Sequence, residues 1–176
     1  MRLSSELAEL RYSSTRSLSS AMSQSGQFAK NILVDAIYER YSFKHREYID
    51  QRLAVATDIQ IPELRVSARH RLSSALNFVQ QPVYRQSKTI SGKQVLAGYM
   101  GAFLRGKTGH WGGAFTFVGK NNNLLLGYRD KGDKDRGIPS VPYGPSIAGA
   151  MANVRDGSYS KVIEHINKRY EKLYGG

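Results

Sequence analysis

Apolar residues recur at helical spacing near the start of this 176-residue chain. Leu3, Leu7 and Leu10 are spaced i, i+4, i+7, and a second helical repeat ends near residue 41. Between them lie seven serines in the thirteen positions 13–25. Serine favours caps and connections over helix interiors. The pattern therefore predicts an N-terminal arm over residues 1–20 that is flexible at its serines and is followed by a helix of the main domain.

The rest of the chain shows two patterns of apolar residues, one typical of helices and one typical of strands. Apolar residues have helical spacing over residues 45–56, 147–154 and 159–174. In between, Leu64 to Arg69 alternate apolar and polar residues, which is typical of a strand with one exposed face. Further strand candidates, separated by glycine-rich connections, are residues 94–104, 113–118 and 123–129. This order predicts an α+β fold, in which N-terminal and C-terminal helices flank an antiparallel sheet in a single domain over residues 21–176.

Aromatic residues of the strand candidates fall at odd-numbered positions. Tyr99, Phe103, Phe115 and Phe117 would share one face of a sheet, since side chains alternate along a strand. We expect that face to be buried, so that replacing Phe115 or Phe117 by alanine costs about 3 to 5 kcal/mol. Trp111 lies beside glycines in the same basic region, where aromatic residues can also stack on nucleic-acid bases. Core packing is the favoured interpretation of these rings.

Positive charge is concentrated in the middle of the chain. The net charge is +12, and no acidic residue occurs between Glu63 and Asp130. A field of one sign attracts polyanions or an acidic protein surface, although it can also be a solvated basic face. We expect this stretch to contact DNA or an acidic partner. Its ten basic residues are Arg65, Arg69, Arg71, Arg85, Lys88, Lys93, Arg105, Lys107, Lys120 and Arg129.

The string GAFLRGKT, at residues 101–108, matches the phosphate-loop pattern G-x-x-x-x-G-K-[ST]. A working phosphate loop leaves a parallel strand and enters a helix whose N-terminal amides face the phosphates. Here the next residues, GHWGG, contain three glycines and lead back into a strand pattern. The string therefore predicts a hairpin connection and not a nucleotide site.

Other reactive chemistry has little support in the sequence. The four histidines are far apart, and none has a second candidate ligand three or four residues away. Asp130, Asp133 and Asp135 alternate with basic residues, which predicts neutralised carboxylates in a solvated loop. The chain has no cysteine, and no apolar run approaches the length of a membrane span. We expect no enzymatic activity, no cofactor, no bound metal, no small-molecule substrate and no membrane partner.

Three segments, in this order, resemble the bacteriophage minor tail protein Z family, whose members are also described as tail-completion proteins. They are AKNILVDAIYERYSFKHREYIDQRLAV, ELRVSARHRLSSALNFV and HWGGAFTFVGKNNNLLLGYRDKGDKDRGIPSVPYGPSI. The common features are two consecutive helices joined by a tyrosine and a basic turn, an alternating strand, a Gly-Ala-Phe, an arginine-bearing strand and a Gly-Pro-Ser helix start. The resemblance spans residues 29–150, and the serine-rich arm and residues 80–94 depart from it.

The resemblance implies a non-enzymatic virion protein in the tail or neck, at the head-proximal end of a phage tail, assembled in the host cytoplasm. It implies a homo-oligomeric ring whose partners are other tail and head–tail connector proteins, with packaged DNA as a further candidate. Leu3, Leu7 and Leu10 would then dock the arm on a neighbouring subunit. The alternative, from a different class, is a cellular nucleic-acid-binding module that uses the basic surface over residues 64–129.

Overall fold

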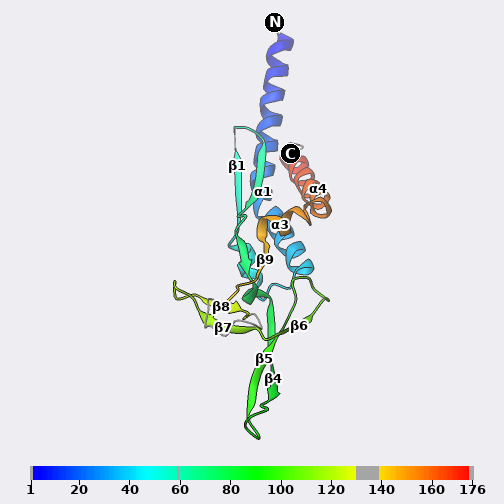
Figure 1. The fold of residues 1–176 in the computed structure, drawn as a ribbon. Coiled ribbons are helices and arrows are strands. Elements are labelled where there is room, and N and C mark those ends of the chain that lie inside the picture. Colours follow the sequence, from blue (N-terminus) through cyan, green and yellow to red (C-terminus); the bar gives the residue numbers. More distant parts are fainter. Residues whose placement is uncertain (1, 59, 130–138, 175–176) are drawn as a thin grey trace.

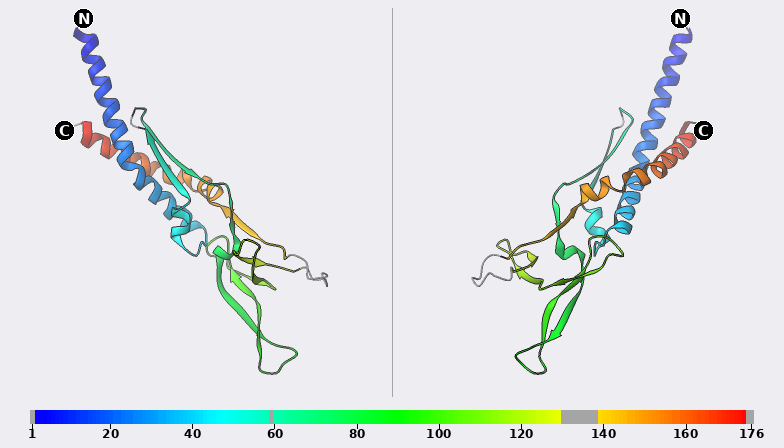
Figure 2. Two further views of the ribbon diagram at one scale, coloured as in Figure 1. Left: turned by 90° about the vertical axis from the view of Figure 1, so that its left-hand side faces the viewer. Right: turned by 45° about the vertical axis from the view of Figure 1, so that its right-hand side comes forward.

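One helix, α1 (Arg2–Arg40), is the longest element of the molecule and would measure about 58 Å at 1.5 Å per residue. The structure is a computed structural model that describes residues 2–58, 60–129 and 139–174. The molecule is elongated, and α1 and α4 (Arg155–Tyr174) lie side by side toward one end (Figures 1 and 2). The β4–β5 hairpin reaches toward the other end.

The other elements follow in chain order. They are α2 (Arg46–Asp50), β1 (Leu53–Asp58), β2 (Glu63–Ala68), β3 (Leu72–Ser74), η1 (Ala75–Phe78), β4 (Val79–Gln86), β5 (Gln94–Gly101), β6 (Gly109–Gly112), β7 (Phe115–Val118), β8 (Leu124–Gly127), β9 (Tyr143–Ser146) and α3 (Ile147–Ala152). Every strand pairing among the described residues is antiparallel. The predicted α+β class, with helices at both ends of the chain, is therefore confirmed.

The strands do not form one sheet. They are divided among β1–β2, β3–β9, β4–β5–β6 and β7–β8, so each group has only two or three strands. Five strands were not predicted. β1 lies largely in the segment expected to be helical, β4 in the stretch that departs from the family resemblance, β6 in a glycine-rich connection, and β3 and β9 in segments to which no element was assigned. The helix expected over residues 45–56 was also too long, because α2 ends at Asp50 and residues 53–58 pair with β2.

The predicted interruption of the first helix at its serines is wrong, because residues 13–25 lie inside α1. Some hydroxyls bond within the helix, as where Ser25 donates to the carbonyl of Ala21 at 2.7 Å. Ser19 and Ser25 are both fully buried, and within the described part of the chain the Ser19 hydroxyl has no hydrogen-bond partner. Ser14 hydrogen-bonds the Tyr170 hydroxyl of α4 at 2.9 Å. Tertiary contacts with α4 thus outweigh the low helix propensity of serine.

Helix α1 also packs on the β1–β2 hairpin, and Gly26 is the point of close approach. A Cβ at Gly26 would lie 2.9 Å from Cγ1 of Val55, which is closer than side chains pack. The absence of a side chain at Gly26 therefore allows the β1–β2 hairpin to pack directly on α1. The hairpin lies toward the same end of the molecule as α1 and α4 (Figure 2).

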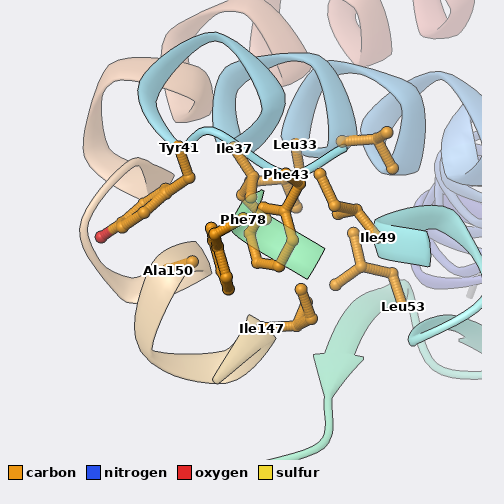
Figure 3. Close-up of a cluster of buried hydrophobic side chains, with 10 residues drawn as sticks. Leu33, Ile37, Tyr41, Phe43, Ile49, Leu53, Phe78, Ile147 and Ala150 are labelled. Atoms are coloured by element: carbon orange, nitrogen blue, oxygen red, sulfur yellow. The ribbon is translucent and has the colours of Figure 1, made fainter. Parts of the chain in front are cut away.

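The main core lies where α1, α2, η1 and α3 meet (Figure 3). Phe78 is fully buried at its centre, with its ring centroid 4.5 Å from that of Phe43. The cluster consists of Leu33, Val34, Ile37, Tyr41, Phe43, Ile49, Leu53, Phe78, Ile147 and Ala150. A smaller cluster contains Ala75, Val79, Ala114 and Leu126. Trp111 is partly buried against both clusters, in agreement with the expected role in packing.

The predicted aromatic sheet face is not formed. Tyr99 belongs to β5, while Phe115 and Phe117 belong to β7 in a different sheet. Phe115 and Phe117 are only half-buried, with ring centroids 5.9 Å apart, so the prediction of full burial is wrong. Phe103 is 37% exposed, but its ring still packs on Phe78 at a centroid distance of 5.1 Å.

Candidate interaction surfaces

The structure distributes the ten predicted contact residues along much of the molecule instead of on one face. Arg65 lies on β2, Arg69 and Arg71 lie between β2 and β3, and Arg85, Lys88 and Lys93 belong to the β4–β5 hairpin. Arg105 and Lys107 lie between β5 and β6, Lys120 lies in the β7–β8 turn, and Arg129 follows β8.

Some of these residues are already engaged within the chain. Arg65 pairs with Glu63, with Nη2 2.6 Å from Oε1. Arg105 donates from Nε to the carbonyl of Tyr38, and its guanidinium lies 4.2 Å from the centre of the Tyr38 ring. Arg105 thus fastens the β5–β6 connection to α1. Glu63 thus offsets part of the charge of Arg65, and Arg105 keeps its charge but has fewer free donors for a partner.

Three arginines, by contrast, converge on one hollow of about 610 Å³ between α2, the β2–β3 link and the start of β8. Arg69 and Arg71 were among the predicted contact residues, but Arg52 was not, because it lies outside the acid-free stretch in a segment read as helix. The described residues that line the hollow include no acid. They are Tyr48, Gln51, Arg52, Arg69, Arg71, Leu72, Ser74, Asn77, Asn123, Leu124, Leu125 and Tyr143.

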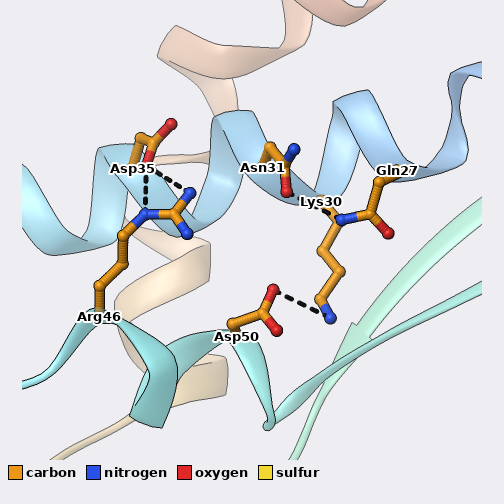
Figure 4. A network of polar contacts seen from close by, with 6 residues as sticks. All are labelled: Gln27, Lys30, Asn31, Asp35, Arg46 and Asp50. Atoms are coloured by element: carbon orange, nitrogen blue, oxygen red, sulfur yellow. Dashed lines mark hydrogen bonds and ion pairs between the residues drawn. The ribbon is translucent and has the colours of Figure 1, made fainter.

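Two carboxylates, one on α1 and one on α2, form salt bridges between these two helices (Figure 4). Asp50 of α2 accepts from Lys30 of α1 at 3.0 Å, and Asp35 of α1 accepts from Arg46 of α2 at 2.7 Å. Both pairs join α1 to α2. Within the described part of the chain, no carboxylate lies within 4.0 Å of a guanidinium nitrogen of Arg52 or of the two other arginines of the hollow. The three arginines of the hollow therefore form no salt bridge with the described chain.

The phosphate-loop string at residues 101–108 forms the connection between β5 and β6. The amide of Lys107 donates to the carbonyl of Leu104 at 3.2 Å, which closes a turn, and β6 begins at Gly109. Gly101 is needed for packing, since a Cβ there would lie 2.8 Å from the Trp111 indole. The predicted hairpin connection is confirmed, and Lys107 is not followed by a helix.

Exposed apolar side chains mark the first turns of α1, which extend beyond the end of α4 (Figures 1 and 2). Leu7, Leu10 and Tyr12 are 62%, 55% and 71% exposed. The side chain of Leu3, the third residue of the predicted docking stripe, lies outside the described residues. A second hollow, of about 930 Å³, opens between these turns and Gln60 at the end of the β1–β2 hairpin.

Titratable groups with shifted pKa values lie away from the arginine hollow. Burial raises the pKa of the Tyr128 hydroxyl. On α4, a hydrogen bond from Lys168 lowers the pKa of Glu164, and the same contact, 2.6 Å long, raises the pKa of Lys168. These shifts arise from an exposed pair one helical turn apart and from local burial, so neither indicates a catalytic group.

The described residues contain neither a group of metal ligands nor a helix that could span a membrane. Among residues 2–58, 60–129 and 139–174, no three His, Asp or Glu side chains are grouped as metal ligands would be. His165 instead stacks on Phe28, with ring centroids 3.9 Å apart. The acidic group of Asp130, Asp133 and Asp135 lies outside the described residues. No helix in the described ranges has the length and apolar character needed to cross a bilayer.

Comparisons with protein-family models, with curated proteins and with solved structures gave no match.

Proposed function

We propose that this chain is a structural virion protein at the head-proximal end of a phage tail, where copies form a ring that completes the tail and joins it to the head. The observation that carries the proposal is an excess of accessible surface. The chain exposes 12566 Å², whereas a compact monomer of 19.7 kDa exposes about 8,600 Å². The excess of about 4,000 Å² falls in the range of 2,000 to 5,000 Å² that large permanent interfaces bury.

The hairpins support this proposal because β4–β5 and β7–β8 extend away from the helices, and because the end of β1–β2 is exposed although the hairpin packs on α1. A two-stranded hairpin is marginally stable alone in water, so an extended one gains from a neighbour. Apolar side chains lie at or near the hairpin ends: Ile61 after β1 is 63% exposed, Ile90 after β4 is 54% exposed and Val118 at the end of β7 is 62% exposed. A ring supplies two neighbouring copies that can cover them.

The start of α1 supplies a further contact for assembly. Exposed leucines on a projecting helix are typical of a segment that docks in a groove of another chain. We assign that groove to a neighbouring subunit. In the proposed ring, the start of α1 docks on a neighbouring subunit. The hairpins contact neighbouring subunits and other tail or connector proteins.

The resemblance over residues 29–150 supports the location at the tail. Its segments include the central part of the fold: the end of α1, the β1–β2 hairpin, η1 and the start of α3. A ring subunit at this location needs no catalytic set. Its partners would be tail and connector proteins, and possible anionic partners include DNA in the lumen and an acidic neighbouring ring.

Labelled particles test the proposal directly. We would bind gold-conjugated antibody fragments against this chain to virions of a phage that encodes it and image them by electron microscopy. The label should lie at the junction of head and tail on most particles. Label along the whole tail, on the capsid or absent from purified virions contradicts the proposal.

A cellular nucleic-acid-binding module is the second candidate, and the unpaired arginines of the hollow favour it. Such a module should bind DNA tightly as a monomer, with a steep dependence on salt. A ring subunit should bind DNA weakly as a monomer and more strongly after assembly, when many copies present their charges together. Tight binding by a protein that never oligomerises would favour the module.

A further inference from the structure

We infer that the arginine hollow binds the sugar–phosphate backbone of duplex DNA. This inference rests on the proposed function and deepens it, because it selects DNA over an acidic protein ring as the partner of the basic surface. The hollow has a volume of about 610 Å³, and its lining includes Arg52, Arg69 and Arg71 but no acidic residue of the described chain.

Arg52 is held in place before any ligand arrives. Its guanidinium carbon lies 3.5 Å from the centre of the Tyr48 ring, and Nη1 donates to the Tyr48 carbonyl at 3.0 Å. Tyr48 in turn stacks on Phe43 of the main core, with ring centroids 5.6 Å apart. One of the five guanidinium N–H donors is therefore used internally, and the rest can be offered to phosphate oxygens.

Neutral donors accompany the arginines in the lining. Gln51, Asn77 and Asn123 carry side-chain amides, and Ser74 and Tyr48 carry hydroxyls. Arginine together with such amide and hydroxyl groups is the usual set that contacts DNA phosphates. The residues come from the end of α2, β3, η1 and the turn before β8, so the fold brings together donors from distant parts of the sequence. One N–H of the Asn77 amide already donates to the Ser74 carbonyl at 3.2 Å, which leaves its second N–H for a ligand.

The rim of the hollow carries exposed apolar side chains. Leu72, Leu124 and Tyr143 are 57%, 52% and 54% exposed. A DNA backbone alternates charged phosphates with deoxyribose rings, whose carbon faces can rest on such side chains. We therefore place phosphates on the arginines and sugars on the rim.

Salt-dependent binding tests the inference. We would measure the fluorescence anisotropy of a short labelled DNA duplex with the full chain at several salt concentrations. Each phosphate contact contributes about 0.9 to the slope of log K against log salt, or about eightfold in affinity at 0.1 M salt. The variant R69Q/R71Q should thus lower the slope by about 1.8 and weaken binding about 60-fold at 0.1 M salt. The matched control is R169Q/K172Q on α4, which removes two charges from exposed sites outside the hollow and should leave the slope unchanged.

Three results would overturn the inference: no binding of duplex by the wild-type chain, an unchanged slope in R69Q/R71Q, or polyglutamate that displaces DNA as well as unlabelled duplex does. Arg52→Gln is a second variant, and its melting temperature is recorded to separate loss of binding from loss of folding. Sedimentation of the same samples measures assembly independently of DNA binding. It therefore distinguishes a failure of the inference from a failure of the proposed function. If rings assemble but their DNA binding is unchanged in R69Q/R71Q, only the inference is refuted. If the chain never assembles, the proposed function is refuted.

Discussion

Replacing both exposed leucines at the start of α1 by alanine should weaken assembly without changing the fold. Leu7 and Leu10 are 62% and 55% exposed, so docking on a neighbour can still bury more than half of each side chain. Full burial of a leucine stabilises by about 1.5 to 3 kcal/mol, and the exposed fractions scale this to roughly 1.7 to 3.5 kcal/mol for the pair. The association constant per contact should therefore fall roughly 20- to 300-fold.

Sedimentation velocity over a range of protein concentrations measures this change. Alanine keeps the helix, since it has the highest helix propensity, so thermal melting of the variant at concentrations where both proteins are dissociated should match the wild type. The control replaces Glu6 and Glu9 by alanine, because both are exposed on the same turns but end in a charged carboxylate instead of an apolar group. If Leu7→Ala/Leu10→Ala assembles as the wild type does, or if the glutamate control weakens assembly equally, these leucines do not dock the arm.

Three further predictions concern stability, the phosphate-loop string and the helix end. Phe78→Ala should cost about 3 to 5 kcal/mol in urea unfolding, because the ring is fully buried, whereas the half-buried Phe117→Ala should cost clearly less. Equal costs would contradict the burial of these rings. Lys107→Ala should leave assembly and stability unchanged, and binding of a fluorescent ATP analogue that is lost in this variant would contradict the hairpin interpretation. Removing residues 1–12 should leave the melting temperature nearly unchanged, while removing residues 1–20 should lower it, since the buried Ser19 and the Ser14 contact with α4 are lost. Equal melting of the two truncations would show that residues 13–20 add nothing to the core.

Periodicity in the sequence was sufficient for the class of the fold and for most helices. The helix at residues 155–174 and the strand at residues 124–127 were both predicted close to their observed bounds, because each buries one side chain face against a partner. The serine-rich part of α1 could not be predicted in the same way. Its helical state depends on packing against α4, which starts more than a hundred residues later in the chain.

The strands show where local pattern misleads. Tyr99 and Phe117 have the same parity in the sequence, yet a glycine-rich connection places them in different sheets, and parity has meaning only within one strand. The β4 strand was missed because it contains Pro82 and several glutamines, which are uncommon in central strands. An edge position in the sheet of β4, β5 and β6 tolerates them.

The arginine hollow could be predicted only in part. The absence of acid between Glu63 and Asp130 pointed to Arg69 and Arg71. Charge patterning could not select those two from the ten basic residues, since the selection depends on the fold, which brings Arg69 and Arg71 together with Arg52 at one hollow. Arg52 had a local signal, a tyrosine four residues earlier at the spacing that allows stacking within a helical turn, but that signal alone does not indicate a ligand site.

The mass of the purified chain in solution tests the proposed ring most directly. Light scattering coupled to size-exclusion chromatography would give the molar mass, and negative-stain images of the same fraction would give the form of the particle. We predict a discrete multiple of 19.7 kDa and closed rings of uniform diameter. A monodisperse species of 19.7 kDa at every concentration, with no rings in the images, would contradict the proposal that the excess surface serves assembly.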